Sequence, residues 1–300
     1  MLNRRFRKVA VLMGGTSDER PVSLKSGAAV ANGLRAAGYD VAEADVVSEE
    51  RLPIPAGTEA VFVALHGRFG EDGGAQALLR AMGMPYTGSG PESSRLAFDK
   101  TLARAALARA GVPIPEGLTL YADPGACPIP LPAVVKPARQ GSSIGCGVVE
   151  TPGAWAAAYA QAAAHGGDVV VETFIPGREL TVGIVDGEPL PVVEIVAPGG
   201  RYDYTAKYTP GVTRYLVPAP LPSAVAAGVR ACALDVFRAL GASDFGRADF
   251  RLDPEGRWYA LELNSIPGFT ETSLLPKAAA AAGIAFPDLC DRILNLASVR

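Results

Sequence analysis

Residues 246–268 read GRADFRLDPEGRWYALELNSIPG, a stretch that predicts two β-strands joined by a tight turn. Its central Asp-Pro-Glu-Gly has Pro in the second position and Gly in the fourth, which suits a type I turn. On both sides of the turn, apolar and polar residues alternate, as in strands that bury one face. The expected buried face consists of Ala248, Phe250, Leu252, Tyr259, Leu261 and Leu263. If the loop runs from Pro254 to Arg257, Asp249 lies directly opposite Glu262.

The polar face of this hairpin offers oxygen ligands for a cation. Asp249, Glu262 and Asn264 are expected to converge on one patch beside Arg247. Mg²⁺ prefers such hard ligands and completes its shell with water and substrate phosphates. The segment SIPGFTETS follows, a Pro-Gly loop with four hydroxyl residues that favours close approach of the backbone to a ligand. We therefore expect a metal site here, with an ordinary polar surface hairpin as the alternative.

Composition limits the classes of protein that the chain can be. At 300 residues, with 49% hydrophobic and 20% charged residues, it should form two or three globular domains. A net charge of −3 and the lack of a basic stripe argue against nucleic-acid binding. No apolar run is long enough for a signal peptide core or a membrane span. We expect a cytoplasmic protein with no membrane partner.

Several catalytic and metal-binding classes are excluded by missing residues. The four cysteines are scattered without a C-x-x-C pair, which argues against a disulfide framework or a zinc site. His66 and His165 are the only histidines, so a His-rich metal site is excluded. There is no G-x-S-x-G elbow of a serine hydrolase.

The N-terminus predicts a strand, a glycine turn and a helix. The strand covers Lys8–Met13, and the helix after GGTSDE runs to about Ala37. Ser17 or Asp18 is the expected N-cap, and Pro21 suits the first turn. The dinucleotide fingerprint G-x-G-x-x-G is absent. A phosphate or carboxylate site at the helix N-terminus and a plain strand-to-helix turn both remain open.

Two further strands complete the predicted α/β domain. They cover Val41–Val46 and Ala60–Leu65, and the second leads into HGRFGEDG. Ligands of open α/β sheets lie just past the carboxyl ends of the strands. His66 is therefore expected to face a ligand, with a purely structural histidine as the alternative.

One helix is predicted over Pro91–Ala110. Lys100 falls on its apolar stripe with Leu96, Ala103 and Leu107. Either the Lys100 ammonium snorkels to solvent, or it points inward at a phosphate.

A second hairpin is predicted by LPAVVKPARQGSSIGCGVVE. Strands over Ala133–Pro137 and Cys146–Glu150 flank the loop RQGSSIG, whose N–H groups can surround phosphate oxygens. A strand follows where a Walker A loop requires a helix, so the loop is of another kind. Lys136 ends the entering strand and could pair with the same phosphates. A flexible hairpin tip is the alternative.

The segment Arg201–Tyr215, RYDYTAKYTPGVTRY, is long, irregular and rich in tyrosine and charge. Such a segment within a compact domain is more often a functional lid than a simple connection. Lys207 and Tyr208 lie at its centre. A helix over Ala224–Leu240 with one apolar face separates it from the first hairpin.

Taken in order, these motifs resemble those of the D-alanine–D-alanine ligases, of the ATP-grasp superfamily, and the resemblance covers nearly the whole chain. The matching stretches are VLMGGTSDERPVSLKSG, FVALHGRFGEDG, PYTGSG, DK, VVKPARQGSSIGCGVV, RELTVGI, YDYTAKY, GRADFRL and LELNSIPGFTETSLLP. The resemblance implies an α/β and α+β architecture, the ATP-grasp fold. A Rossmann-like parallel-sheet domain at residues 1–95 would precede a central subdomain at 96–179 and a C-terminal subdomain at 180–300, which clasp ATP.

The resemblance also implies roles for residues that match the family motifs by position. Residues implied to bind ATP are Lys100, Lys136, Ser142, Ser143, Glu172, Phe174, Ile175, Glu179 and Lys207. Two Mg²⁺ (or Mn²⁺) ions would be held by Asp249, Glu262 and Asn264. The two D-alanines would be bound by Glu19, His66, Arg247, Gly268, Ser273 and Leu274. Arg247 and the Gly268 N–H would stabilise an oxyanion, and Glu19, Ser142 and Tyr208 would close the lid as a latch.

The implied reaction joins two D-alanines through an acyl phosphate, for peptidoglycan precursor synthesis, in an enzyme expected to be a homodimer. A ligase that makes D-alanyl-D-lactate is the alternative within the family, although Tyr208 favours an amine acceptor. A nucleotide-binding module without catalysis is the alternative outside it. The sequence departs from the usual family pattern at Thr173, Ser265-Ile266, Phe269 and Asp18–Pro21. The first of these leaves the polar contacts at the adenine edge open.

Overall fold

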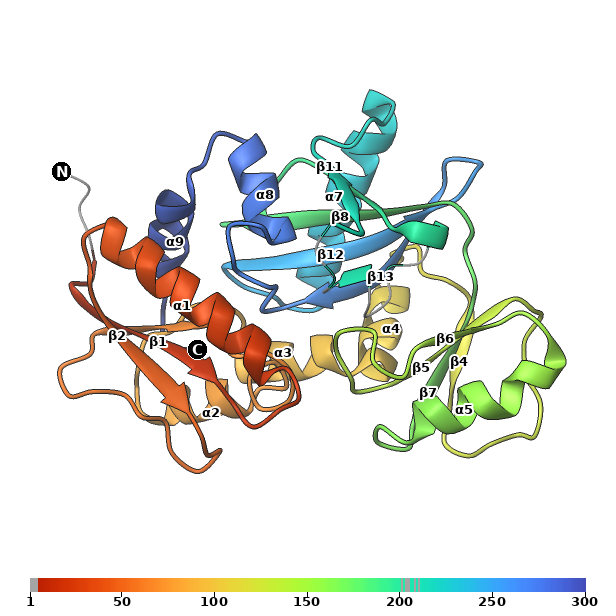
Figure 1. The fold of residues 1–300 in the computed structure, drawn as a ribbon, viewed down its shortest axis with the longest axis horizontal. Helices are drawn as coiled ribbons and strands as arrows, with labels where there is room; N and C mark the ends of the chain where they lie inside the picture. The colour runs from red at the N-terminus through yellow and green to blue at the C-terminus, as the bar shows by residue number, and fades with distance from the viewer. Residues whose placement is uncertain (1–4, 201, 203–205, 208, 210) are drawn as a thin grey trace.

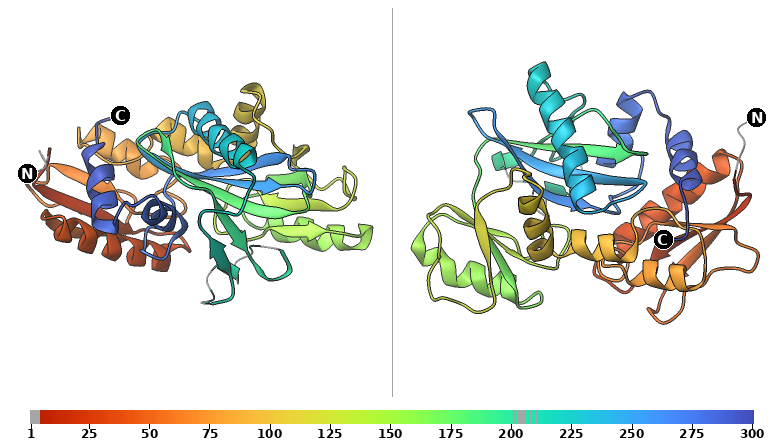
Figure 2. Two further views of the ribbon diagram at one scale, coloured as in Figure 1. Left: turned by 90° about the horizontal axis from the view of Figure 1, so that it is seen from above. Right: turned by 180° about the vertical axis from the view of Figure 1, so that it is seen from behind.

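The computed structural model describes residues 5–200, 202, 206–207, 209 and 211–300. Three β-sheets organise this part of the chain, and Figure 1 shows one sheet in each of three lobes. Seen from above, the lobes lie side by side along the long axis, with the N-terminal lobe and the central lobe at opposite ends (Figure 2). This arrangement agrees with the predicted α/β and α+β architecture.

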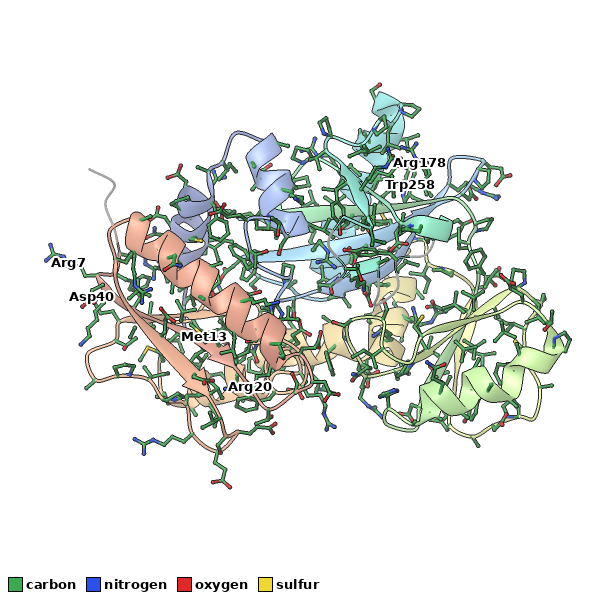
Figure 3. All side chains as sticks on the ribbon, viewed as in Figure 1. Arg7, Met13, Arg20, Asp40, Arg178 and Trp258 are labelled. Carbon is green, nitrogen blue, oxygen red and sulfur yellow. The ribbon has the colours of Figure 1, made fainter. Side chains whose placement is uncertain are left out.

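The N-terminal sheet is parallel, in the order β2-β1-β3. Its elements are β1 (Lys8–Gly14), α1 (Arg20–Ala36), β2 (Asp40–Val46), β3 (Ala60–Val63) and α2 (Gly74–Ala81). After its exposed first residue, β1 is buried throughout, as expected for a parallel strand covered on both faces. α1 packs closely on β1: a Cβ added at Gly27 would lie 2.4 Å from Cβ of Met13, which Figure 3 labels under this helix.

The predicted N-cap of α1 is wrong. The helix starts at Arg20 with Glu19 as N-cap, and no side chain caps it, although Pro21 does lie in the first turn. Ser17 instead donates its hydroxyl proton to the main-chain oxygen of His66, at 2.8 Å. A tertiary hydrogen bond therefore uses the side chain that local sequence assigns to the cap, and the Glu19 carboxylate remains available for other contacts.

The central sheet is antiparallel, in the order β4-β7-β5-β6. Its elements are β4 (Gly117–Leu120), β5 (Ala133–Pro137), β6 (Gly147–Val149), η1 (Pro152–Ala154), α5 (Trp155–Ala163) and β7 (Val169–Thr173). Trp155 and Tyr159 of α5 are buried against alternate residues of the strands, so α5 covers one face of this sheet and leaves the other face uncovered by it.

The C-terminal sheet has six strands, ordered β11-β10-β8-β12-β13 with β9 paired to β8. They are β8 (Arg178–Val185), β9 (Glu188–Pro189), β10 (Val193–Val196), β11 (Arg214–Leu216), β12 (Phe245–Leu252) and β13 (Trp258–Asn264), with η2 at Pro198–Gly200. α7 (Ser223–Ala239) covers one face with its apolar stripe, as predicted. Arg178 and Trp258 begin β8 and β13 and flank Leu252 at the turn end of the sheet (Figure 3).

The hairpin β12–β13 has Asp249 opposite Glu262, as predicted, but by a different route. Leu252 pairs with Trp258, so the loop is one residue longer than predicted, and a β-bulge at Leu261 restores the register. Between this bulge and the turn, the residues of β13 therefore face the side opposite to the predicted one. Ala260 is buried in the core instead of Tyr259, and Leu261 faces a cavity instead of the core.

The single helix predicted over residues 91–110 is wrong, because the chain forms α3 (Pro91–Phe98) and α4 (Lys100–Arg109). Asp99 breaks it: its backbone is extended at φ −85°, ψ 104°, and its carboxylate accepts hydrogen bonds from the N–H groups of Thr101 and Leu102. Asp99 is therefore the N-cap of a new helix. This break places Lys100 at the first position of α4.

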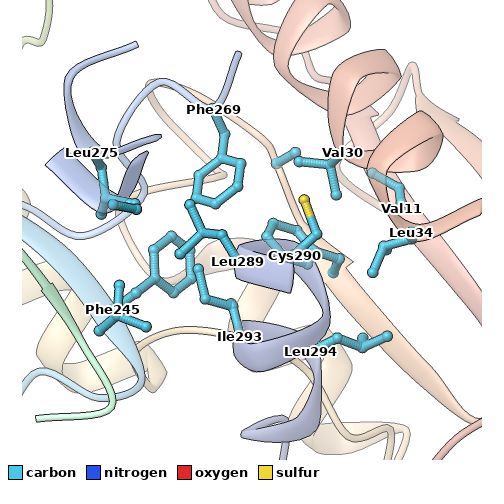
Figure 4. Packing of buried hydrophobic residues seen from close by; sticks show 14 of the residues in the cluster. Val11, Val30, Leu34, Phe245, Phe269, Leu275, Leu289, Cys290, Ile293 and Leu294 are labelled. Carbon is cyan, nitrogen blue, oxygen red and sulfur yellow. The ribbon is translucent and has the colours of Figure 1, made fainter. Parts of the chain in front are cut away.

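The C-terminal helices α8 (Leu274–Ala281) and α9 (Phe286–Asn295) pack between the N-terminal and C-terminal lobes. Figure 4 shows α9 with its apolar side chains between Phe245 of β12 and Val30 and Leu34 of α1. Both chain ends thus lie at the N-terminal lobe (Figure 2). Within the described residues, no helix is long and apolar enough to cross a membrane.

Candidate functional site

Two adjoining cavities lie where the three lobes meet. The first, of about 300 Å³, lies between the central and C-terminal sheets. The second, of about 530 Å³, lies between the N-terminal lobe and the loop that follows β13. Gly141, Ser142, Tyr202 and Lys207 line both cavities. A group bound in one cavity is therefore within reach of a molecule bound in the other.

The first cavity gathers residues that the sequence assigned to the nucleotide. The predicted nucleotide-binding residues that line it are Lys100, Lys136, Ser142, Ser143, Glu172, Phe174, Ile175, Glu179 and Lys207. Asp249 and Glu262, two of the three predicted metal ligands, line it as well. Sequence segments from the central and C-terminal lobes thus meet around one space.

Glu172, which lines this cavity, forms ion pairs with two basic side chains, those of Arg104 and Lys136. It is 2% exposed, and its carboxylate contacts the Arg104 guanidinium and lies 2.6 Å from Nζ of Lys136. Burial alone would raise the pKa of Glu172, but Lys136 and Arg104 outweigh it and the pKa lies below its usual range. Burial likewise opposes the charge on Lys136, and Glu172 more than compensates, so its pKa is raised. Lys136 is therefore a fixed, charged ammonium.

Lys100 points inward rather than to solvent, which is one of the two orientations expected from the sequence. Its ammonium donates to the main-chain oxygen of Gln140 at 2.7 Å and lies 3.8 Å from Oε2 of Glu262. Burial lowers the pKa of Lys100, and Glu262 opposes that shift. The ammonium thus lies between the serine loop and the acidic hairpin.

The loop between β5 and β6 folds over the boundary of the two cavities. Ser142 and Ser143 adopt left-handed backbone conformations, with φ of 52° and 58°. The Ser142 hydroxyl donates to Glu19 Oε1, so the loop is tied to the N-terminal lobe. A Cβ added at Gly141 would lie 2.8 Å from Oε2 of Glu19, so the loop backbone and this carboxylate approach each other closely. Tyr208, the third residue of the predicted latch, lies outside the described residues.

Arg251 organises the other end of the first cavity. Its guanidinium donates to the main-chain oxygens of Ile175 and Gly177, each at 3.0 Å, and to Oε2 of Glu179 at 3.2 Å. It also lies over the Phe174 ring, with Cζ 5.7 Å from the centroid. Sequence analysis missed this role, because Arg251 appears there only as one polar residue of an alternating strand. Its partners become visible only when β8 and β12 pair.

Glu179→Gln should change stability in a pH-dependent way. Burial raises the pKa of Glu179 to about 7, with Arg251 opposing the shift. A carboxyl whose pKa is raised in the folded state stabilises the protein at low pH, and that contribution is lost as pH rises through about 7. The variant should therefore melt at a higher temperature than the wild type at pH 8, by roughly 2–4 °C per kcal/mol. At pH 5 the two proteins should melt at nearly the same temperature.

Differential scanning calorimetry at both pH values measures this difference. Glu188→Gln, at an exposed position beside the turn between β8 and β9, is the matched control and should show no pH-dependent difference. An equal shift of the Glu179→Gln variant at pH 5 and pH 8 would contradict the assignment.

The predicted metal ligands meet beside Arg247. Asp249 Oδ1 and Oδ2 accept from Arg247 Nε and Nη2, at 2.9 and 2.8 Å, and Oδ1 also accepts from Thr181 Oγ1 at 2.6 Å. Asn264 Nδ2 donates to Asp249 Oδ2 at 2.9 Å. Burial alone would raise the pKa of Asp249, but Arg247 outweighs it and the pKa lies below its usual range. The carboxylate is therefore held ionised.

These donors fit a magnesium ion that shares its shell with phosphate. Within the described residues, no group of three or more His, Cys, Asp or Glu side chains is placed to hold a metal ion. The hairpin offers two carboxylates, of Asp249 and Glu262, and one amide oxygen, of Asn264. Mg²⁺ typically takes one or two protein carboxylates and completes its shell with water and phosphate oxygens.

The second cavity gathers the residues that the sequence assigned to the amino-acid substrates. They are Glu19, His66, Arg247, Gly268, Ser273 and Leu274. His66 is 5% exposed, with Nδ1 3.7 Å from Glu71 Oε1 and Nε2 3.0 Å from Ser26 Oγ. Burial raises the pKa of Glu71, and His66 opposes the shift. His66 thus lines the second cavity and also contacts Ser26 and Glu71, and its expected role toward a ligand stays a prediction.

Sequence analysis missed Ser26, Glu71 and Lys277 of this second cavity. Glu71 was visible in the HGRFGEDG loop, five residues after His66, and its position there was the available signal. Ser26 is one of several small residues on the inner face of α1, and nothing in the sequence sets it apart. Lys277 lies in α8, with Nζ 5.7 Å from the ring centroid of Tyr215.

Comparison with known proteins agrees with this geometry. Residues 42–89 match the family model "D-ala D-ala ligase N-terminus", and residues 127–295 match "D-ala D-ala ligase C-terminus". The D-alanine–D-alanine ligase of Syntrophotalea carbinolica is 46% identical over 297 residues, covering 98% of this chain and 97% of that protein. That of Acidiphilium cryptum is also 46% identical, over 98% of this chain and 100% of its own.

Solved structures give the same result. The crystal structure of the D-alanine–D-alanine ligase of Bacillus anthracis superposes with a TM-score of 0.84 at 31% identity, covering 97% of both chains. The structure of that enzyme in complex with ATP superposes with a TM-score of 0.82 at 29% identity, again over 97% of both chains.

Proposed function

The chain belongs to the D-alanine–D-alanine ligase family and ligates two D-alanines at the expense of ATP, and we propose that its two cavities divide this reaction between them. ATP lies in the first cavity, with its terminal phosphate toward the residues that line both. The two D-alanines lie in the second cavity. The observation that supports this division is the shared wall formed by Gly141, Ser142 and Lys207.

In the first step, a carboxylate oxygen of the first D-alanine attacks the γ-phosphorus, and the bond from phosphorus to ADP breaks. The main task of a phosphoryl-transfer site is to position the groups and offset their negative charge. Lys100, Lys136 and Lys207 supply ammonium groups along the cavity for this purpose. Glu19 would hold the ammonium of the first D-alanine, while its contact with Ser142 keeps the serine loop closed.

Divalent cations, Mg²⁺ or Mn²⁺, would be held by Asp249, Glu262 and Asn264. When bound, they neutralise charge on the phosphates during transfer. Arg247 and its neighbours keep Asp249 ionised and fixed in orientation before any cation arrives. Lys100 lies near enough to Glu262 to limit the repulsion between that carboxylate and a phosphate.

In the second step, the amine of the second D-alanine attacks the acyl carbon, and phosphate leaves as the peptide bond forms. The intermediate carries an oxyanion, and one well-placed donor contributes roughly 3 kcal/mol to such a step. Arg247 and the Gly268 N–H are the proposed donors. Ser273 and Leu274 at the start of α8 would bind the carboxylate of the second D-alanine, where the helix N-terminus favours an anion.

Residues 1–95, 96–179 and 180–300 are the proposed domains. Each is built mainly on one of the three sheets, although β8 begins at Arg178, two residues before the last limit. We further propose that the protein acts in the cytoplasm as a homodimer and supplies D-alanyl-D-alanine for peptidoglycan precursors. Metal preference, domain limits and assembly would be tested by metal titration, limited proteolysis and light scattering.

A phosphate-release assay with a panel of D- and L-amino acids and D-lactate tests the substrates directly. With ATP and Mg²⁺ present, D-alanine alone should release phosphate, while L-alanine should give only background. D-Alanine with D-lactate should give no extra product near neutral pH. Preferential use of D-lactate would indicate the ester-forming alternative. Tight ATP binding without phosphate release would indicate a non-catalytic module.

A further inference from the structure

A buried serine of α1 links the first-substrate side of the second cavity to the loop that carries Gly268. Ser26 Oγ accepts a hydrogen bond from the Phe269 N–H at 3.1 Å and lies 3.0 Å from Nε2 of His66. The residue is 1% exposed and lines the cavity. One hydroxyl therefore joins three segments that are far apart in the sequence.

The donors and acceptors of this cluster favour one arrangement of protons. The backbone N–H of Phe269 can only donate, so the Ser26 oxygen accepts there. The Ser26 hydroxyl can then donate to Nε2 of His66 if the ring carries its proton on Nδ1. Nδ1 lies 3.7 Å from Glu71 Oε1, the distance of an ion pair rather than of a hydrogen bond. Glu71 Oε2 accepts from the Gly67 N–H at 3.2 Å.

Gly268 lies directly before the residue that Ser26 holds. A Cβ added at Gly268 would meet nothing closer than Ser273 Oγ, at 3.4 Å, so packing restrains this glycine little on that side. Glycine also has the greatest backbone freedom of any residue. The hydrogen bond from Phe269 to Ser26 fixes the peptide plane that follows Gly268.

We propose that Ser26 is a positioning residue for the ligation step: it anchors the Phe269 N–H, directly after Gly268, and so holds the loop that presents the Gly268 N–H to the oxyanion, and its hydroxyl donates to Nε2 of His66 and keeps that ring in the Nδ1-protonated tautomer. This inference rests on the proposed function of Gly268. It adds a coupling between the site of the first D-alanine and the oxyanion loop.

The test compares Ser26→Ala with Ser23→Ala. Ser23 lies one turn earlier on the same helix, is fully buried, and donates its hydroxyl proton to the Ala64 main-chain oxygen at 2.8 Å. Each variant thus loses one buried hydroxyl of α1, but only Ser26 contacts His66 and Phe269. Ser26→Ala should lower kcat by about 10- to 100-fold, because an oxyanion donor is displaced rather than removed. KM for ATP should stay unchanged, and Ser23→Ala should keep the wild-type kcat.

Imidazole ¹⁵N NMR measures the tautomer of His66. This tautomer should not change if Ser26 only stabilised the fold. The chain has only two histidines, so His66 and His165 are readily distinguished, and His165 serves as an internal reference. Wild-type His66 should give the shifts of a single neutral tautomer protonated on Nδ1. Ser26→Ala should give averaged shifts for His66, and Ser23→Ala should not.

Three results would overturn the proposal. They are an Nε2-protonated His66 in the wild type, an unchanged kcat in Ser26→Ala, and an equal loss of kcat in Ser23→Ala. The first needs no variant, so it decides the matter even if Ser26→Ala does not fold. Failure of the proposed function would look different, because the wild-type protein itself would then release no phosphate with D-alanine.

Discussion

Glu262→Gln should reduce kcat by about 10³-fold, roughly 4 kcal/mol at 1.36 kcal/mol per factor of ten. The substitution keeps the size of the side chain and removes one of the two carboxylates that the hairpin offers to a cation. Folding should be little affected, because the Glu262 side chain is 32% exposed and its ion pair with Lys100 is long at 3.8 Å. Lys100 is largely buried, but it keeps its hydrogen bond to the main-chain oxygen of Gln140 at 2.7 Å.

The measurement is ADP release at saturating D-alanine over a range of Mg²⁺ concentrations, together with a melting curve. Glu255→Gln is the matched control, because Glu255 lies in the turn of the same hairpin and is exposed. Its Oε2 lies 3.2 Å from Nη2 of Arg257, whose side chain is exposed as well. It should leave both rate and melting temperature unchanged. Wild-type turnover in Glu262→Gln at every Mg²⁺ concentration would show that this carboxylate holds no essential cation.

Arg247→Lys is the second substitution with a large expected effect, a loss in kcat of about 10²- to 10³-fold, or about 2.7–4 kcal/mol. Lysine keeps the positive charge but cannot reproduce the two parallel hydrogen bonds that Arg247 makes to Asp249. The same change removes a proposed donor to the oxyanion. Because Arg247 is not among the residues that line the first cavity, KM for ATP should change little.

Steady-state kinetics and a Mg²⁺ titration separate the two roles of Arg247. A loss in kcat at saturating Mg²⁺ indicates the oxyanion role, whereas full recovery at high Mg²⁺ would indicate that Arg247 acts only by orienting Asp249. Arg257→Lys is the control, since Arg257 pairs with Asp253 through Nε at 2.7 Å in the same hairpin but on a largely exposed side chain. A wild-type kcat in Arg247→Lys would contradict both roles.

Local sequence was sufficient to predict an element where one of its faces is buried and its apolar residues recur at every second position. The alternation in β12 and β13 predicted the hairpin, and Asp249 does lie opposite Glu262. The prediction also contained two compensating errors, since neither the longer loop nor the bulge at Leu261 leaves a mark in a single sequence. The strand pairing reveals the shift in register, since Phe250, Arg251 and Leu252 pair with Ala260, Tyr259 and Trp258.

Tertiary contacts explain the other differences. Ser17 has the chemistry of an N-cap, yet it donates to His66 of another segment. Asp99 is one polar residue in a helical pattern, and its role as a cap depends on a backbone turn that the pattern does not require. Ser26 and Arg251 contribute to the cavities through partners 40 or more residues away. Residues of this kind become visible only when the lobes are assembled.

The most direct test of the whole account is anomalous diffraction from a crystal grown with Mn²⁺, D-alanine and a non-hydrolysable ATP analogue. The account predicts anomalous peaks that bridge the carboxylates of Asp249 and Glu262, the Asn264 amide oxygen and the terminal phosphates, at coordination distances of about 2.1 Å as for Mg²⁺. Peaks elsewhere, with these three side chains turned away from every ion, would contradict it.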